Sequence, residues 1–356
     1  MVQLTSNFTS EAPLAPAIRE AISVALADGW ADPKKSSQAA TKAAALRHGC
    51  LEELASHFGA RPSQIEVVGE PNLAYFLAIS GLLTPELELV TSSIDLGKIR
   101  AVARAHSGGK FELNVGRDGL YKNISEIPSV PSLIVLQSCN GETGVRQNGI
   151  DAVKENFASS AHIILDASHD IPNAAMITGI SSAIFDSTSW GGPGGLGLLY
   201  ISEPARYRYP LPHIAPIRTP GSYSLPLLVG AAIALTLYKE SLTSIFALRK
   251  YAAAALSKID GVSVVAADTG AQSRYLSFLI DGISSEELLR SLQPLRIELD
   301  AGSACSPEDL TPSHVIAAMG LPTTGHMRIT LHPESTQDEI DYLVANIVVV
   351  LSQLRS

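Results

Sequence analysis

Residues 185–200, FDSTSWGGPGGLGLLY, contain the spacing G-x-G-x-x-G at Gly192, Gly194 and Gly197. In dinucleotide-binding proteins this spacing bends a strand into a helix, so that backbone N–H groups meet a pyrophosphate at the helix N-terminus. Here Leu-Leu-Tyr-Ile follows the last glycine, and such residues favour a strand. A strand–turn–strand has no helix dipole to offer a phosphate. We therefore interpret the spacing as chance within a glycine-rich loop.

Cys305 is a candidate nucleophile in the stretch LDAGSACSPEDLTPSHV. Small residues surround it and Pro307 follows two positions later, which predicts an exposed loop. An exposed thiol is nucleophilic where its surroundings support the thiolate. The alternative is an inert loop cysteine, and His314 is too generic to identify as its base.

Two polar residues follow apolar runs. Asp166 ends the run Ile-Ile-Leu, which predicts a position at the carboxyl edge of a parallel strand, where open α/β sheets bind ligands. The alternative is a helix N-cap. Asn140 begins NGETG after another apolar run, and by itself this pattern indicates a turn.

The composition predicts a large folded core. The chain has 356 residues, of which 46% are hydrophobic and 17% charged, enough for one large domain and a smaller one. The net charge of -9, without a run of five basic residues, argues against a nucleic-acid or anionic membrane surface. The longest apolar stretch, 225–238, contains Pro226 and Gly230 and indicates a buried helix.

The N-terminal stretch MVQLTSNFTSEAP has neither the basic nor the apolar region of a signal peptide. Three cysteines, Cys50, Cys139 and Cys305, provide no disulfide framework. His162 and His169 with Cys139 lack the spacing of metal ligands, so no metal site is expected. These features predict a cytoplasmic protein with reduced thiols.

Apolar runs alternate with helical patterns in the first part of the chain, which predicts βαβ units and a mostly parallel sheet. The expected strands are 64–68, 87–91, 132–137, 162–165, 183–185 and 197–201, and the expected helices are 15–27 and 38–58. After about residue 240 the pattern changes to helices at 242–257, 285–292 and 335–354 and strands at 261–267 and 273–281. Thr336 and Glu339 form a capping box before the last helix.

In this order the segments resemble the cysteine desulfurase branch of the class V aminotransferases, pyridoxal-phosphate (PLP) enzymes of fold type I. The stretch GSACS…DLTPSHV resembles the loop with the persulfide-forming cysteine, here Cys305, and HIILDAS resembles the strand whose aspartate pairs with the pyridine nitrogen, here Asp166. NGETGVRQ resembles the family's N-N-E-T-G-V-x-Q, and RITLHPESTQDEID its C-terminal entry segment. The similarity runs from about Asn7 to the C-terminus.

The resemblance implies an α/β, fold type I PLP-transferase-like architecture. A large domain, 14–245, would hold a mostly parallel sheet flanked by helices. Residues 1–13 and 246–356 would form a smaller α+β domain that carries the Cys305 loop.

The stretch 185–200 resembles the family's S-x-H-K-x-x-G-P-x-G-x-G-x-L-Y, whose lysine forms the Schiff base with PLP. That lysine falls on Ser189, the preceding histidine on Thr188 and the serine on Asp186. No lysine lies between Lys154 and Lys239, so a shift of one or two positions does not restore it. The anchoring lysine is missing.

The family's phosphate-holding G-G-T-E-A-N falls on EPNLAY, where Pro71 lacks a backbone donor and Glu70 brings a carboxylate toward the phosphate. Two unit charges about 4 Å apart repel by ~4 kcal/mol at an effective dielectric of 20. A helix N-terminus stabilises a nearby negative charge by only ~0.3–1 kcal/mol, which is less than this repulsion. The stacking histidine falls on Leu96, the glutamine near the ring oxygen on His169, and the carboxylate-holding arginine on Pro333.

The resemblance with these losses implies a catalytically degenerate desulfurase homologue, a pseudoenzyme without covalently bound PLP. It would act as a scaffold or partner, or carry persulfide sulfur on Cys305. Family members are homodimers, so the chain would self-associate or pair with an active desulfurase or a sulfur acceptor. The remnant pocket would comprise Asn140, Asp166, His169, Asp186, Thr188 and Arg218, the last in a distorted RTPGS.

Two alternatives remain open at this point. One is an active PLP enzyme that acts on cysteine or another amino acid and holds the cofactor non-covalently, for which Asp166 and Asn140 are the best support. The other is a new small-molecule site in the vacated pocket, lined by His169, Asp166 and Thr188.

Overall fold

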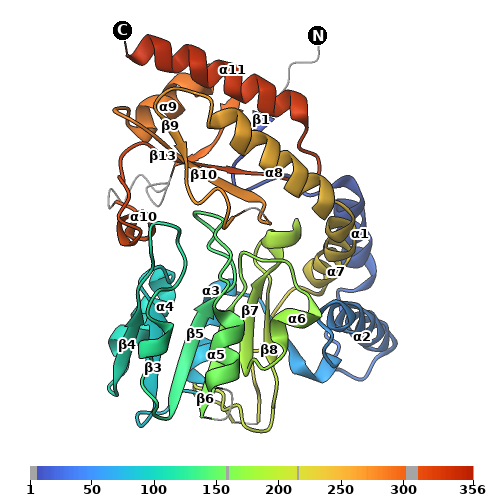
Figure 1. The fold of residues 1–356 in the computed structure, drawn as a ribbon. Coiled ribbons are helices and arrows are strands. Elements are labelled where there is room, and N and C mark those ends of the chain that lie inside the picture. Colours follow the sequence, from blue (N-terminus) through green and yellow to red (C-terminus); the bar gives the residue numbers. More distant parts are fainter. Residues whose placement is uncertain (1–5, 158–159, 215, 271, 302–311, 356) are drawn as a thin grey trace.

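The computed structural model describes residues 6–157, 160–214, 216–270, 272–301 and 312–355. Two sheets lie one above the other, and helices α7 and α8 connect the two parts (Figure 1). The larger sheet has seven strands in the order β2-β8-β7-β6-β5-β3-β4. Their bounds are β2 Ile65–Val68, β3 Glu88–Ser92, β4 Lys110–Leu113, β5 Ser132–Gln137, β6 Ala161–Asp166, β7 Ser182–Asp186 and β8 Gly197–Ile201. β8 runs opposite to the other six strands, so the predicted mostly parallel sheet is confirmed.

Both faces of this sheet are covered, which explains why its strands read as continuous apolar runs. All residues of β5 are buried. Leu133 and Val135 join the core on the side of α3 (Pro71–Ser80), whereas Ile134 and Leu136 join the core that includes α2 and α7. The strand therefore supplies alternate side chains to two separate cores.

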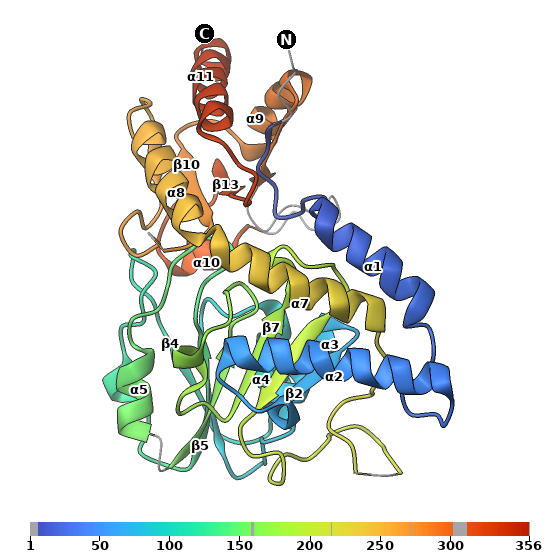
Figure 2. The same cartoon turned by 90° about the vertical axis from the view of Figure 1, so that its right-hand side faces the viewer.

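Helix α7 (Leu225–Glu240) lies between α1 (Pro16–Asp28) and α2 (Gln38–Phe58) (Figure 2). Gly230 permits the close contact with α1, because a Cβ atom there would lie 2.7 Å from Ile22 Cδ1. Among the described helices none is by itself long and apolar enough to span a membrane. The pair formed by α7 and α8 (Leu242–Leu256), bent by 62°, meets that criterion only when both are taken together, and by length and composition alone.

The second sheet is antiparallel, with strand order β12-β13-β10-β9. Its strands are β9 Val262–Val264, β10 Tyr275–Ile280, β12 Asp300–Ala301 and β13 His326–Thr330. The short strand β1 (Ser6–Asn7) pairs in parallel with β11 (Ile297–Glu298), which ties the N-terminal segment to this part of the molecule. The other helices are α4 Gly97–Ala105, α5 Ile150–Phe157, α6 Ala174–Ile177, α9 Ser285–Leu292, α10 His314–Ala318 and α11 Gln337–Leu354. The capping box of Thr336 and Glu339 is present at the start of α11, as predicted.

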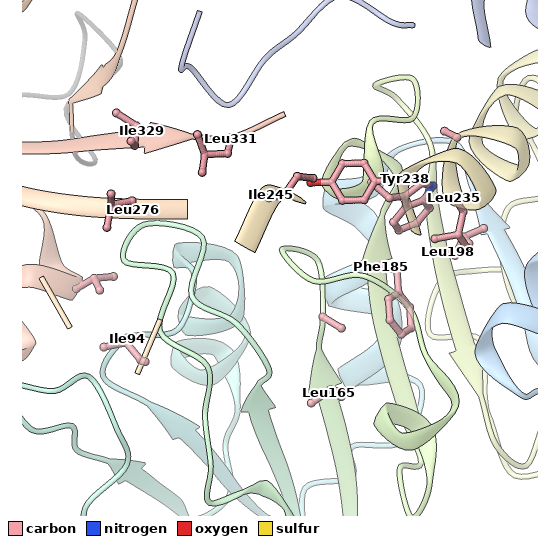
Figure 3. Close-up of a cluster of buried hydrophobic side chains, with 14 of the residues drawn as sticks. Ile94, Leu165, Phe185, Leu198, Leu235, Tyr238, Ile245, Leu276, Ile329 and Leu331 are labelled. Carbon is pink, nitrogen blue, oxygen red and sulfur yellow. The ribbon is translucent and has the colours of Figure 1, made fainter. Parts of the chain in front are cut away.

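One hydrophobic cluster runs from the large sheet through α7 and α8 to the second sheet (Figure 3). Its members in this region include Leu165, Phe185, Leu198, Leu235, Tyr238, Ile245, Leu276, Ile329 and Leu331. The Tyr238 ring lies on α7 with its hydroxyl directed toward the side of the second sheet. The carboxyl edge of the parallel strands thus faces the second sheet across a shared core.

Candidate functional site

The glycine-rich loop connects two antiparallel strands. Asp186 at the end of β7 pairs with Gly197 at the start of β8, and the short helix η3 (Ser187–Trp190) opens the turn. A Cβ atom on Gly192 would lie 2.8 Å from the Ser187 carbonyl oxygen. Because a strand and not a helix follows Gly197, the predicted strand–turn–strand is confirmed. Gly192 therefore serves the packing of the turn.

Ser189, where the resemblance places the family's lysine, is 2% exposed. Its hydroxyl lies 2.7 Å from the carbonyl oxygen of Asp186 and 3.0 Å from that of Asp170. The neighbouring Thr188 is exposed, and its backbone N–H and hydroxyl both donate to the Asp186 carboxylate, at 3.0 and 2.8 Å. These three predicted site residues therefore contact one another or the local backbone.

Asp166 begins a hydrogen-bond chain that ends at His169. The Ser168 hydroxyl donates to the Asp166 carboxylate at 2.6 Å and lies 3.0 Å from His169 Nδ1. The single Ser168 proton goes to Asp166, so His169 Nδ1 is the donor in the second bond. Burial raises the pKa of Asp166. Burial, followed by the charges of Arg328 and Arg274, lowers the pKa of His169 to about 3, which leaves the imidazole neutral at pH 7.

Asn140 has its side chain engaged within the NGETG turn. Its Oδ1 accepts from the backbone N–H groups of Glu142 and Thr143, and its Nδ2 donates to Gln137 at 2.8 Å. A Cβ atom on Gly144, which has φ +75°, would lie 2.5 Å from the carbonyl oxygen of Tyr275 at the start of β10. The turn therefore joins the large sheet to the second one.

A carboxylate from the chain itself, that of Glu70, caps the N-terminus of α3. Glu70 is the N-cap residue, and its carboxylate accepts from the backbone N–H of Asn72 at 2.9 Å, while Pro71 occupies the first turn. The ammonium group of Lys98 contacts the Asn72 side chain and lies 5.3 Å from the centre of the Tyr75 ring. Charged groups of the chain itself therefore occupy this helix terminus.

Tyr75, the last residue of EPNLAY, is 5% exposed. Burial raises its pKa well above the usual value; the Asp166 charge raises it further, and hydrogen bonding with Ser168 opposes the shift. The Tyr75 hydroxyl thus lies close to the start of the Asp166–Ser168–His169 chain.

A cavity of about 770 Å³ lies between the N-terminal segment, the glycine-rich loop, the end of α7 and the second sheet. We call it the interdomain cavity. His169 and Thr188 line it, whereas Asp166 is not among its lining residues. Its other polar lining residues include Ser10, Glu11, Tyr238, Glu240, Ser241, Arg274, Tyr275, Arg328, His332 and Glu334.

Sequence reasoning missed Arg274 and Tyr238 as site residues. The local sequence shows only that Arg274 is a charged residue directly before the apolar strand that begins at Tyr275. Tyr238 gives no local signal, because it ends an apolar helical run.

Another predicted site residue, Arg218, is not among the described residues that line the interdomain cavity. Arg218 pairs with the Glu66 carboxylate and lines a separate cavity of about 1000 Å³. Cys305 lies outside the described residues. His314 is described, and its Nε2 contacts the Asp95 carbonyl oxygen at 3.0 Å.

This arrangement, a mostly parallel seven-stranded sheet beside a small antiparallel sheet, is the fold of type I PLP-dependent enzymes. A NifS-like protein superposes with a TM-score of 0.86 at 20% identity, covering 98% of this chain and 100% of that one. The apo structure of a cysteine desulfurase from Thermococcus onnurineus NA1 has a TM-score of 0.81 at 14% identity, with coverage of 98% and 94%.

Sequence comparison indicates the branch. Residues 221–343 match the family Aminotransferase class-V. A cysteine desulfurase of Klebsiella pneumoniae is 26% identical over 381 aligned positions, covering 100% of this chain and 94% of that protein. The cysteine desulfurase NifS of Azotobacter vinelandii is 29% identical over 174 positions, or 46% and 43% of the two chains. The chain is thus similar to the cysteine desulfurase branch of the class V aminotransferases.

Proposed function

We propose that the chain is a catalytically degenerate relative of the cysteine desulfurases that acts as a partner protein without a PLP Schiff base. The observation that carries this proposal is the state of Ser189, which replaces the lysine expected from the resemblance. Its buried hydroxyl bonds to the Asp186 and Asp170 carbonyl oxygens, and it does not line the interdomain cavity. It has neither the amine nor the accessibility that covalent attachment of PLP requires.

The surrounding residues also fit PLP poorly. The Glu70 carboxylate occupies the N-terminus of α3, where the resemblance places the cofactor phosphate. Each unit of negative charge on a phosphate about 4 Å away would meet a repulsion of ~4 kcal/mol at an effective dielectric of 20. Tyr75, which stands at the last position of the family's phosphate-holding motif, lies beside Asp166 and Ser168, the groups nearest the expected ring nitrogen. No catalytic step is therefore assigned to PLP.

The absorption spectrum of the purified protein tests this part of the proposal. PLP is added first and L-cysteine second, with the protein-free solution as the reference. We expect added PLP to keep its free spectrum and cysteine to release no sulfide. A visible band that follows the protein concentration and shifts on addition of cysteine would instead support the alternative, an enzyme that holds PLP non-covalently with the help of Asp166.

As a partner, the protein would either bind another chain or carry persulfide sulfur. Three exposed apolar side chains on and after α1 support protein contact: Val24, Leu26 and Trp30, which are 58%, 60% and 74% exposed. They suit a second copy of this chain or an active desulfurase, since aromatic anchors such as Trp30 are enriched in interfaces.

The carrier role would use Cys305. Its thiolate would attack the outer sulfur of a donor persulfide, forming a new S–S bond as the donor's S–S bond breaks. The donor leaves as a thiolate, so the step needs no oxidant or reductant. The described cysteines suit this role less well, because burial raises the pKa of Cys50 to about 11 and that of Cys139 to about 12.

Persulfide labelling after incubation with an active desulfurase and L-cysteine tests the carrier role. We expect label on the natural chain and on a Cys50→Ala variant, and none on a Cys305→Ala variant. Equal labelling of the natural chain and Cys305→Ala would exclude the carrier role. It would leave the partner role to be tested by co-elution of the two proteins on a sizing column.

A further inference from the structure

We propose that the interdomain cavity binds a small monocarboxylate with an apolar body, and that Arg274 holds the carboxylate. The proposal concerns the chain without PLP and does not rest on the partner role. Arg274 directly precedes β10, lines the cavity and is 6% exposed. Its Nε is buried without a hydrogen-bond partner among the described residues.

No described carboxylate neutralises Arg274. The arginines that do form ion pairs within the described part of the chain are Arg146, Arg206, Arg218 and Arg328. An arginine stays charged in proteins, and a buried charge without a partner is costly. A bound anion would remove this cost, which is why a buried guanidinium with no ion pair to a described carboxylate indicates a ligand.

Tyr238 provides a second observation at the same guanidinium. This residue of α7 lines the same cavity and is 1% exposed. Its hydroxyl oxygen interacts with the Arg274 guanidinium, and no described residue accepts the hydroxyl proton. Burial raises the pKa of Tyr238, so the group remains a hydroxyl that can donate. The Tyr275 ring lies 5.0 Å from Arg274 Cζ, a cation–π contact that orients the guanidinium.

The charges of the cavity favour a monoanion. Its other guanidinium, that of Arg328, already pairs with Asp300. Burial lowers the pKa of His169 to about 3 and that of His332 to about 4, with nearby arginines adding to each shift, so both rings are neutral at pH 7. The lining also includes the carboxylates Glu11, Glu240 and Glu334. Arg274 is therefore the lining guanidinium without an ion pair, and the three carboxylates would repel a phosphate dianion more strongly than a monocarboxylate.

The rest of the cavity lining is apolar and favours a ligand with an apolar body. Its apolar side chains include Leu14, Ile18, Trp190, Ala234 and Leu237. The volume of about 770 Å³ is within the range of ~300–1,000 Å³ that is common for small-molecule sites.

The arginine of this site is not the one that the resemblance would supply. That arginine falls on Pro333, which follows β13 and also lines the cavity. Arg274 comes from the neighbouring strand, where its carbonyl oxygen accepts from the N–H of Leu331 at 2.9 Å. The chain thus supplies a guanidinium to the cavity from a different position in the sequence.

Calorimetric titration of the full chain without PLP tests the site, with phenylacetate and hexanoate as carboxylate probes. We expect both to bind and their neutral amides and inorganic phosphate to bind at least tenfold more weakly. Arg274→Gln should weaken phenylacetate binding by about tenfold or more, since a charged hydrogen bond contributes ~1.5–3 kcal/mol. Arg290→Gln, on the exposed side of α9, is the matched control and should leave binding unchanged.

Tyr238→Phe keeps the proposal testable if Arg274→Gln does not fold. It should weaken phenylacetate binding by about three- to tenfold, the effect of one neutral hydrogen bond. Three results would overturn the site: neither carboxylate binds, the amide binds as tightly as phenylacetate, or both cavity variants bind like the natural chain. Tighter binding of phosphate than of phenylacetate would overturn the assignment to a monocarboxylate.

Discussion

The carboxylate of Glu70 accepts a hydrogen bond from the backbone N–H of Asn72, and so caps α3 with a side chain of its own. A free N–H group and the positive end of the helix dipole are what an external phosphate would use. At the position that resembles a phosphate-holding motif, the Glu70 carboxylate thus takes the place at the helix N-terminus that a phosphate would use.

The capping predicts a specific loss of stability. Glu70→Ala removes the acceptor, and we expect the free energy of unfolding to fall by about 0.5–1 kcal/mol, as for other N-cap losses. Urea denaturation measures this change. Glu20→Ala, at an exposed position within α1, is the control and should change stability by less than ~0.5 kcal/mol. Equal effects of the two substitutions would contradict the capping role.

Two glycines of the loop provide a matched pair. A Cβ atom on Gly192 would lie 2.8 Å from a backbone oxygen of Ser187, whereas one on Gly194 would have nothing within 4 Å. We expect Gly192→Ala to destabilise the chain by ~1–3 kcal/mol, the usual range for overpacking. Gly194→Ala should stay within ~0.5 kcal/mol of the natural chain. Thermal unfolding measures both variants, and equal unfolding temperatures for Gly192→Ala and Gly194→Ala would contradict the packing role of Gly192.

We expect truncation of Tyr75 to lower the free energy of unfolding more than the substitutions above, because its ring is buried beside Asp166. Tyr75→Ala removes a large ring and should lower the free energy of unfolding by ~3–5 kcal/mol. Tyr75→Phe keeps the ring and loses only the hydroxyl, so a cost of about 0.5–1.5 kcal/mol is expected. If Tyr75→Ala unfolded at the same urea concentration as Tyr75→Phe, the ring would not fill this space.

Asp95 predicts a pH dependence of stability. Burial, opposed by the N–H of Ser92, raises the pKa of this fully buried carboxyl to about 8. The nearby carboxylates Asp166 and Glu112 add to the shift, and Arg100 opposes it. Between the unfolded pKa of about 3.9 and the folded value, the unfolded chain is ionised while the folded one holds its proton. The contribution of Asp95 to stability therefore falls as pH rises through this window and is constant above it.

Asp95→Asn stays neutral at every pH and isolates this contribution. The stability of the variant minus that of the natural chain should increase from pH 5 to pH 8, by at most ~1.4 kcal/mol per pH unit. Urea denaturation at pH 5, 6.5, 8 and 9 measures the difference. Asp260→Asn, at an exposed position, serves as the control and should give a flat difference. A decrease with pH for Asp95→Asn would contradict the assignment.

Local sequence signals determined much of the fold. The bounds 38–58 and 285–292 predicted for two helices agree with α2 and α9, because their ends carry Ser37, Gly59 and the capping box of Ser284. The strand after Gly197 was predicted from Leu-Leu-Tyr-Ile alone. Capping and strand preference depend on residues a few positions apart, so the sequence contains them directly.

The sequence did not predict α3 or α4. Helix α3 is short and apolar around most of its circumference, since it packs against the large sheet, so it lacks the periodicity of a half-exposed helix. Helix α4 follows Leu96, which provides no capping side chain. Their formation depends on the surface they cover.

The sequence by itself, through the resemblance, predicted which family residues are replaced, above all the lysine at the position of Ser189. Only the tertiary structure decided what the remaining groups do. Asn140 bonds within its own turn, Glu70 caps α3, and Arg274 and Tyr238 meet at one cavity although a helix, a turn and a strand separate them along the chain. The direction in which a side chain points, and whether it finds a hydrogen-bond partner, depend on contacts between segments distant in the sequence. Local residue spacing therefore does not predict them.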